Sequence, residues 1–478
     1  MWETLELPLW LVLIAGLLAA LSLLNHFLIP SARWFLRRRL NRVIDDMNER
    51  LALRLPSFKL TRREVLIDRL TYDPVVMAAV EEAAEQRGEP RDAVMVEVSR
   101  YAREIVPAFN AFLYFRVGYW LARRVARFLY RVRVGYVDDR GLADMGPTDS
   151  VVFVMNHRSN MDYVLAAYLA ADRTTLSYAV GEWARVWPLQ QLIRALGAYF
   201  VRRESGDTLY RRVLARYVEM ATEGGVPQAV YPEGGLSRDG RLRPPKLGIL
   251  GYITRAFDPA GPRDIVFVPV GINYDRVLED RSLLLSLDPD RARRGAGFAL
   301  RTAFGFVGRN LLLMARGRWH RFGYACVNFG APVSYRDWLR RTGVDPAASS
   351  QEEWFEAVRR LGEDLMAAIG AVVPVLPVSL VAAVLAADPD RRFSELELKG
   401  AVLALIERLE AAGARLYVPR TDRDYAVTVG LRMLAMRHAV TEEDGLYRVS
   451  AHNLPLLRYY ANAIAHLLPE ADRRAAAE

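Results

Sequence analysis

Residues 151–163 read V-V-F-V-M-N-H-R-S-N-M-D-Y, an apolar run that passes directly into a short polar segment. The apolar part, with its three valines, predicts a buried β-strand. Open α/β sheets bind their ligands at the carboxyl ends of their strands, so His157 is expected at such an end. Asp162 follows five positions later, and its carboxylate could orient the imidazole and stabilise the protonated ring. This stretch therefore predicts a buried strand whose carboxyl end carries His157 as a candidate base.

Asp162 also has a purely structural interpretation. Ser159 and Asp162 have the S-x-x-D spacing of a capping box, which would start a helix near Asn160. The two interpretations are compatible, because a helix that begins there would hold Asp162 rigidly and bring it back towards His157. An H-x4-D spacing occurs by chance in many proteins, so the surrounding sequence has to decide its meaning.

The same fold signal continues along the chain in four more apolar runs: G-A-Y-F-V (197–201), Q-A-V-Y (228–231), I-V-F-V-P-V (265–270) and Y-A-C-V-N-F (324–329). Helical stretches, among them 209–222, separate these runs. Strands that alternate with helices predict a mostly parallel sheet flanked by helices, and we place this α/β domain at 135–345. The single cysteine, Cys326, excludes an internal disulfide and is expected to be a core residue.

Helical regions are predicted on both sides, over 31–134 and 346–478, from their helical apolar spacing. Within the first region, residues 109–134 mix aromatic side chains with arginines at positions 116, 123, 124, 127, 131 and 133. Such a basic aromatic helix suits the surface of an anionic membrane, and a solvated helix packed on the next domain is the alternative. The net charge of +9 likewise favours an anionic partner.

The N-terminal residues 1–30 are predicted to be a membrane anchor. Leu9 to Ile29 form a nearly unbroken apolar run, long enough to cross a hydrocarbon core of about 30 Å. Two glutamates precede this run and five arginines follow it within 33–42, so the positive-inside rule places the rest of the chain in the cytoplasm. A helix lying in the membrane surface and a buried core helix are the alternatives.

Three further segments carry residues suited to binding an anionic substrate. The strand at 197–201 ends in Arg202 and Arg203, whose planar guanidinium groups match phosphate oxygens. In Y-P-E-G-G-L-S-R-D-G-R (231–241), Gly234 and Gly235 permit a tight turn whose amides can approach an anion. Glu233 could accept a hydrogen bond from a substrate hydroxyl. Cations at positions 238, 241 and 246 add positive charge, and V-P-V (268–270) could line an apolar slot.

These segments together resemble the four blocks of the glycerolipid acyltransferase superfamily, in order and in spacing. The blocks are H-R-S-N-M-D, G-A-Y-F-V-R-R, E-G-G-L-S-R and V-P-V. Within this superfamily, the chain most resembles the bacterial membrane-bound glycerol-3-phosphate 1-O-acyltransferase family. That resemblance extends beyond the blocks to P-V-G-I-N-Y-D-R-V-L-E (269–279) and L-L-R-Y-Y-A-N-A-I-A-H-L-L (456–468). One departure is Leu236, which stands where the family usually has an arginine.

The resemblance implies an enzyme that transfers a fatty acyl group from acyl-CoA or acyl carrier protein to the 1-hydroxyl of glycerol 3-phosphate. It implies His157 as general base and Asp162 as its orienting partner, with no metal and no cofactor. Anionic membrane lipids would be partners at the cytoplasmic membrane, and nucleic acid would not. The implied substrate-binding residues are Arg158, Ser159, Arg202, Arg203, Glu233, Gly234, Gly235, Ser237, Arg238, Arg241, Lys246 and Pro269.

Three alternatives remain at this point. The acceptor could be lysophosphatidate or dihydroxyacetone phosphate, and Leu236 keeps that choice open. A basic adaptor of membranes or nucleic acids would fit the charge, but the sequence has no zinc spacing or aromatic RNA-binding block. A serine hydrolase would need a G-x-S-x-G elbow, which is absent from the sequence.

Overall fold

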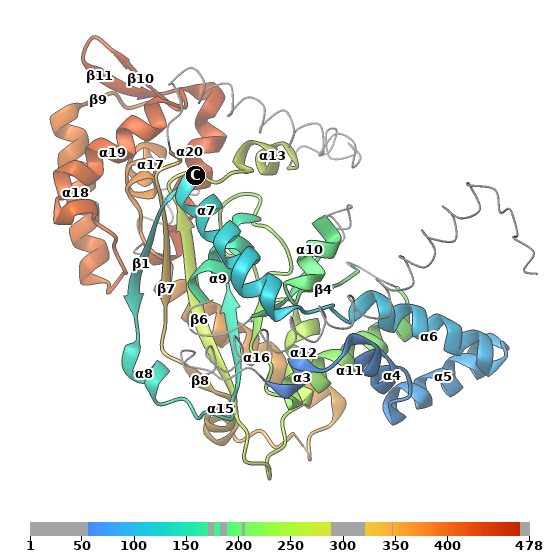
Figure 1. Ribbon diagram of the computed structural model, residues 1–478. Helices are drawn as coiled ribbons and strands as arrows, with labels where there is room; N and C mark the ends of the chain where they lie inside the picture. Colours follow the sequence, from blue (N-terminus) through green and yellow to red (C-terminus); the bar gives the residue numbers. More distant parts are fainter. Residues whose placement is uncertain are drawn as a thin grey trace, which may run out of the picture. The chain divides into compact units, whose positions relative to one another are not determined.

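The computed structural model describes residues 56–170, 176–181, 189–202, 206–287, 321–346 and 348–468 (Figure 1). The predicted anchor at 1–30 and Arg203 therefore lie outside the described residues. No helix of the part that is described is both long enough and apolar enough to cross a membrane.

A mixed sheet of eight strands forms the centre of the fold, in the order β1-β7-β6-β2-β5-β3-β4, with β8 paired to β6. Its strands are β1 (Arg131–Val137), β2 (Ser150–Met155), β3 (Ser177–Val180), β4 (Tyr199–Phe200), β5 (Gln228–Val230), β6 (Ile265–Tyr274), β7 (Tyr324–Phe329) and β8 (Val333–Ser334). Only the pairs that β6 makes with β7 and β8 are antiparallel within this sheet. The predicted α/β fold with a mostly parallel sheet is confirmed.

The two central strands are the most apolar, and both are buried along their whole length. β2 pairs in parallel with β5 on one side and with β6 on the other, which places Val154 opposite Pro269. Strands buried on both faces read as continuous apolar runs, which is why these two could be recognised in the sequence. Cys326 on β7 is fully buried, as expected.

Helices cover the sheet and pack on one another beside it. α16 (Gln351–Val372) packs against β6 and α12 (Leu247–Arg255), and α12 in turn packs against α11 (Thr208–Glu223). Four N-terminal helices pack against α11, namely α3 (Ser57–Leu60), α4 (Arg63–Thr71), α5 (Pro74–Arg87) and α6 (Arg91–Ile105). Further helices are α8 (Asp139–Ala143), α9 (Met161–Ala170), α10 (Leu189–Ala195), α13 (Asp280–Leu285) and α15 (Tyr335–Thr342).

The basic helix predicted over 109–134 is shorter than expected. A π-helical turn, η2 (Leu113–Gly118), leads into α7 (Tyr119–Leu129), and the chain then turns extended at Tyr130. Arg131 and Arg133 consequently lie on β1 and not on a helix, which corrects the prediction. The arginines continue across this boundary without a break in pattern, so periodicity alone could not locate it. α7 packs on α9.

The C-terminal region is largely helical, as predicted, and also contains a small sheet that was missed. The region begins with α16, and the four helices that follow it are α17 (Pro377–Ala387), α18 (Glu395–Ala411), α19 (Arg423–Ala435) and α20 (Leu454–Ala461), with short turns η4 (Pro419–Thr421), η5 (Ala451–Asn453) and η6 (Ala465–Leu467). α17 is mostly buried and contacts the other three helices. The strands β9 (Phe393–Ser394), β10 (Val440–Glu443) and β11 (Leu446–Val449) form the sheet β10-β11-β9, which lies beside α18 and α19 (Figure 1).

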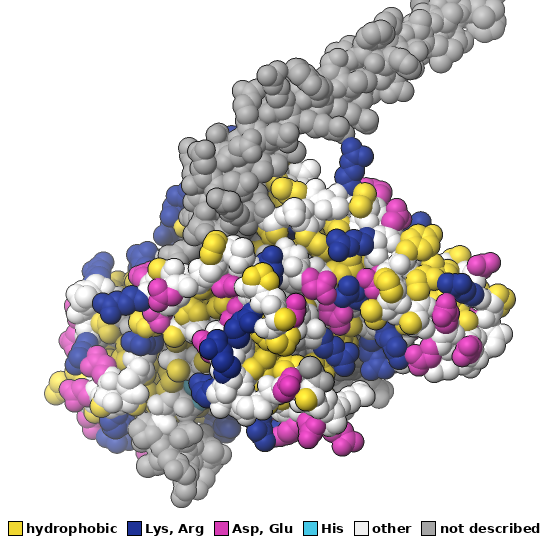
Figure 2. Space-filling view, turned by 90° about the horizontal axis from the view of Figure 1, so that it is seen from below, with side chains coloured by type: hydrophobic (Ala, Val, Ile, Leu, Met, Phe, Trp, Pro, Cys, Tyr) yellow, Lys and Arg dark blue, Asp and Glu magenta, His cyan; other side chains and the backbone are white. Residues whose placement is uncertain are grey.

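One face of the molecule carries charges of both signs. On the face seen in Figure 2, cationic, acidic and hydrophobic side chains are intermingled. Exposed ion pairs such as Arg359–Glu356 and Arg448–Glu443 are examples of this mixing. The segment 109–137 differs, because it holds six arginines and no Asp or Glu.

Candidate active site

His157 and Asp162 meet at the carboxyl end of β2, as the sequence predicts. β2 ends at Met155, α9 begins at Met161, and the intervening loop folds back so that Nδ1 of His157 lies 2.9 Å from Oδ2 of Asp162. His157 is 2% exposed and Asp162 is fully buried. A proton on Nδ1 satisfies the carboxylate and leaves the lone pair on Nε2. The pair therefore has the geometry of a general base and its orienting acid.

Asp162 is held by backbone amides as well as by His157. The amides of Arg158 and Ser159 donate to its Oδ2 at 2.8 and 3.0 Å, and the hydroxyl of Tyr274 donates to its Oδ1 at 2.5 Å. The hydrogen bond from the Ser159 amide to Asp162 is one half of the predicted capping box. The other half differs, because the Ser159 hydroxyl accepts from the amide of Met161 rather than from that of Asp162. One geometry therefore allows Asp162 both to cap the start of α9 and to orient His157.

Two tyrosines fix the plane of the His157 ring. Tyr231 stacks on it with ring centroids 4.1 Å apart, and Tyr163 meets it edge-on at 5.4 Å. Burial, and secondarily the charge of Asp162, raise the pKa of Tyr231 well above its ordinary value, so its hydroxyl keeps its proton. Packed rings on two sides leave the imidazole little freedom to rotate.

Glu233 joins the loop after β5 to the His157 loop. One carboxylate oxygen accepts from the amide of His157 at 2.8 Å, and the other accepts from the amide of Arg243 at 3.0 Å. Burial raises the pKa of Glu233 to about 7, although the hydrogen bonds from these two backbone amides lower it. The amide of Ser237 donates to the carbonyl of His157 at 2.9 Å, which bonds the two loops a second time. Glu233 is 1% exposed, so the structure gives it backbone partners in place of an open position towards a substrate hydroxyl.

The loop between Glu233 and α12 presents a glycine turn among exposed cations. Gly234 has a φ of +67°, and its exposed backbone lies against the side chain of Lys246. Ser237 closes the following turn, since its hydroxyl donates to the carbonyl of Arg241 and accepts from the amide of Gly240. The exposed cations of the loop are Arg238, Arg241, Arg243 and Lys246. None of these four has an ion-pair partner among the residues that the structure describes, so they are available to an anion.

Arg202, the arginine of the second block that the structure describes, is bound by a carboxylate of the protein itself. Arg202 forms a two-pronged ion pair with Glu104 of α6, at 2.9 and 2.7 Å. Its guanidinium also lies over the rings of Tyr101 and Tyr210. The planar group predicted to face phosphate oxygens is thus occupied by a carboxylate.

Three other predicted residues, Arg158, Ser159 and Pro269, are buried. Arg158 is 3% exposed, donates through Nη1 to the carbonyl of Gly240 at 2.9 Å and lies over the ring of Tyr459 at 5.2 Å. Its Nε and Nη2 have no hydrogen-bond partner within the described ranges. The Ser159 hydroxyl donates to Glu279 at 2.7 Å, and Pro269 is buried on β6.

Several residues near the dyad were not recognised from the sequence. Glu279 accepts from the Ser159 hydroxyl and from the amide of Asn160, so it holds the turn before α9. The neighbouring Asp280 pairs with buried Arg437 of the C-terminal region. Glu279 and Tyr274 both lie in P-V-G-I-N-Y-D-R-V-L-E (269–279), whose resemblance was visible although its contacts were not.

α20 and the residues after it close the site from the C-terminal side. Tyr459 covers Arg158, and the amide nitrogen of the Asn462 side chain donates to the carbonyl of Asp239 at 2.9 Å. Gly240 passes so close that a Cβ there would lie 2.0 Å from the carbonyl oxygen of Tyr459. The run L-L-R-Y-Y-A-N therefore packs on Arg158 of the first block and on the two residues that directly follow the third block.

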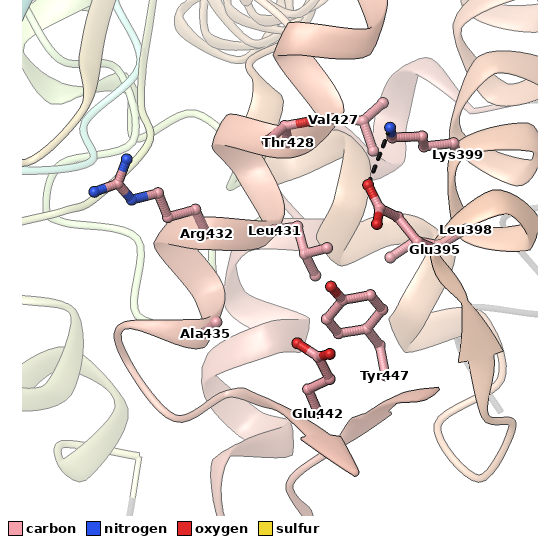
Figure 3. A pocket seen from close by; sticks show the side chains of 10 residues that line it. All are labelled: Glu395, Leu398, Lys399, Val427, Thr428, Leu431, Arg432, Ala435, Glu442 and Tyr447. Carbon is pink, nitrogen blue, oxygen red and sulfur yellow. Dashed lines mark ion pairs between the residues drawn. The ribbon is translucent and has the colours of Figure 1, made fainter. Parts of the chain in front are cut away.

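A cavity of about 240 Å³ lies elsewhere, among α18, α19, β10 and β11 (Figure 3). Lys399 at its wall already pairs with Glu395 at 3.0 Å and with Asp424 at 3.5 Å. In Figure 3 the side chain of Arg432 points away from the other labelled residues. The cavity shares no lining residue with the His157 site, and we assign no chemistry to it.

Among the described residues no cluster of three or more His, Cys, Asp or Glu could hold a metal ion.

Comparison with known proteins identifies two matching families. The family "Acyltransferase" matches residues 137–273, and the family "Glycerol-3-phosphate acyltransferase C-terminal region" matches residues 309–471. The glycerol-3-phosphate acyltransferase of Pseudoalteromonas atlantica is 27% identical over 460 residues, which are 93% of this chain and 53% of that protein. That of Ectopseudomonas mendocina is 30% identical over 433 residues, 85% of this chain and 49% of that protein. The chain spans about half the length of the curated relatives it matches.

A likeness to one solved structure is weaker. The 1-acyl-sn-glycerophosphate acyltransferase of Thermotoga maritima matches 52% of this chain and 79% of that chain, with 18% identity and a TM-score of 0.28. A TM-score at this level supports no conclusion about the fold.

Proposed function

We propose that this chain, which belongs to the glycerol-3-phosphate acyltransferase family, transfers a fatty acyl group from a thioester to the 1-hydroxyl of sn-glycerol 3-phosphate. The donor is acyl-CoA or acylated acyl carrier protein, and the products are lysophosphatidic acid and the free thiol. This is the first step of phospholipid synthesis. The observation that carries the proposal is the buried His157–Asp162 pair beside a glycine turn ringed by exposed cations.

His157 acts as the general base in this proposal. Its Nε2 takes the proton of the acceptor hydroxyl while the hydroxyl oxygen bonds to the carbonyl carbon of the thioester. The carbon–sulfur bond then breaks, and the proton passes from Nε2 to the departing thiolate. A thioester is already an activated acyl donor, so a well-placed base suffices and contributes about 10²–10⁴-fold to the rate. Asp162 holds the imidazole in the tautomer that the proton transfer needs.

The phosphate of the acceptor binds over the turn at Gly234 in this proposal. The exposed glycine backbone lets an anion approach closely, and the cations at 238, 241 and 246 surround it. The negative charge of glycerol 3-phosphate would be neutralised there by side chains that have no ion-pair partner in the described part of the loop. We leave Arg202 out of this set, because Glu104 occupies its guanidinium.

The purified chain with one acyl-CoA should form lysophosphatidic acid only when glycerol 3-phosphate is present. Product is identified by mass spectrometry, and thiol release is followed in parallel. Thiol release that does not depend on any acceptor would indicate a thioesterase and would overturn the proposal.

Replacing Arg238 and Lys246 by alanine should raise KM for glycerol 3-phosphate. A charge-assisted hydrogen bond contributes about 1.5–3 kcal/mol, so a loss of about tenfold or more is expected for each cation that touches the phosphate. KM for the acyl donor should change less than about twofold. R448A removes an arginine from the β10–β11 hairpin and is the matched control. An unchanged KM for glycerol 3-phosphate in R238A/K246A would contradict the assigned phosphate site.

A second part of the proposal concerns the cytoplasmic face of the membrane, where the acyl product belongs. The outer face of η2 and α7 exposes Phe112, Val117, Trp120, Leu121 and Phe128, with exposed fractions between 38% and 59%. Arginines 116, 123, 124 and 127 are exposed on the same segment, which has no acidic residue. Apolar and cationic side chains on one helix suit the headgroup region of an anionic bilayer. We therefore propose that this face lies on the membrane.

The membrane contact of α7 is testable on the full chain by a label. Cys326 is the single cysteine and is fully buried, so W120C can be labelled selectively with a fluorophore. In discs of anionic lipid we expect brominated acyl chains to quench this label strongly. L396C, on α18 at a residue that is 82% exposed, is the control and should remain unquenched. Equal quenching at the two positions would contradict the proposed membrane face.

A further inference from the structure

Tyr274, the last residue of β6, lies directly behind the dyad. It is fully buried, and its hydroxyl donates to Oδ1 of Asp162 at 2.5 Å. The three other donors to this carboxylate, among the described residues, all bond to Oδ2. Tyr274 is therefore the partner that fixes the second oxygen, and with it the rotation of the carboxylate about its Cβ–Cγ bond.

The fold holds Tyr274 firmly in this position. β6 pairs with β7 so that Tyr274 lies opposite Ala325, and its ring packs against that of Tyr130 at 5.2 Å. Burial and the charge of Asp162 raise the pKa of Tyr274 well above its ordinary value, so the hydroxyl keeps its proton and remains a donor. A rigid strand with a permanent donor is a suitable support for a catalytic carboxylate.

We propose that Tyr274 is a positioning residue of the active site, which acts on His157 through Asp162. The inference rests on the proposed function and adds a residue to it. By fixing Oδ1, Tyr274 keeps Oδ2 aligned with Nδ1 of His157, so that Nε2 points consistently at the acceptor hydroxyl. By donating a hydrogen bond, it also disperses part of the carboxylate charge that would otherwise act on the imidazolium ring.

The variant Y274F removes this one hydroxyl and keeps the ring. We expect kcat to fall by about ten- to a hundredfold, the range for loss of a group that orients a catalytic residue, with KM for both substrates changed less than about twofold. The acid limb of the pH–rate profile should move to higher pH, because the undispersed charge of Asp162 holds the proton on His157 more tightly. A packing role alone would not move this limb.

Y130F is the matched control. Tyr130 is 1% exposed, packs on the same ring, and donates to the carbonyl of Arg276 rather than to Asp162. In a chain that already carries D162N, adding Y274F should change kcat very little, because the effects of two residues that act through one another are not additive. If Y274F and Y130F have the same kcat, or if Y274F slows D162N as much as it slows the unmodified chain, the proposal is overturned.

A measurement without substrate separates this proposal from the proposed function. In chain labelled with ¹⁵N-histidine, the Nδ1 proton of His157, identified by its loss in H157A, should exchange with solvent at least about tenfold faster in Y274F than in Y130F. Equal exchange would overturn the positioning role whatever the enzyme acylates. Inactivity of the unmodified chain towards glycerol 3-phosphate would instead overturn the proposed function and leave this exchange test in force.

Discussion

The variant H157A is expected to lose acyl transfer to glycerol 3-phosphate by about 10²–10⁴-fold while the protein remains folded. Without the imidazole, the acceptor hydroxyl must lose its proton to water, and the departing thiolate has no acid beside it. The alanine keeps the two backbone hydrogen bonds of this position. Its amide still donates to Glu233, and its carbonyl still accepts from the amide of Ser237. The loss should therefore appear in kcat and only weakly in KM.

The matched control for this variant is H452A, which removes an exposed histidine from η5. Thiol release and product formation are measured for both variants, and melting temperatures are compared. We expect H452A to retain activity within about twofold. An H157A variant with undiminished turnover would show that the base is another group.

The variant G240A is expected to disable the enzyme through packing rather than chemistry. Gly240 has a φ of +89°, and an alanine in this conformation costs on the order of 1–3 kcal/mol. Its Cβ would also lie 2.0 Å from the carbonyl oxygen of Tyr459, which is backbone of α20 and cannot swing away. Either the loop or α20 has to move, and the carbonyl of Gly240 would then no longer hold Arg158.

G413A provides the comparison, because Gly413 has a φ of +79° with nothing within 4 Å of the position of its Cβ. The two variants share the backbone strain, and only G240A displaces α20. We expect G240A to melt at least roughly 5 °C below G413A and to lose most of its activity. Equal melting temperatures and equal rates would mean that α20 does not support the site.

Much of the fold could be predicted because its central strands are buried on both faces. β2 and β6 are continuous apolar runs, and the alternation of such runs with helices predicts a parallel sheet. The boundary between α7 and β1 could not be predicted, since Arg127 and Arg131 belong to one uninterrupted basic pattern. The sheet β10-β11-β9 was missed because strands of two to four residues have no detectable period.

The site was predictable where its chemistry is local in sequence. His157 and Asp162 are five residues apart, and the strand before them determines where they emerge. The partners of Arg202 and Asp162 were not predictable, because Glu104 and Tyr274 are 98 and 112 residues away. Glu233 illustrates the same limit, since the amides that it binds become visible only when two loops come together.

The identity of the acceptor is tested most directly by comparing three acceptors. The purified chain is given one acyl-CoA with glycerol 3-phosphate, lysophosphatidate or dihydroxyacetone phosphate, and kcat/KM is measured for each. We expect the highest value for glycerol 3-phosphate, and loss of that activity in H157A. A higher kcat/KM for lysophosphatidate would contradict this expectation.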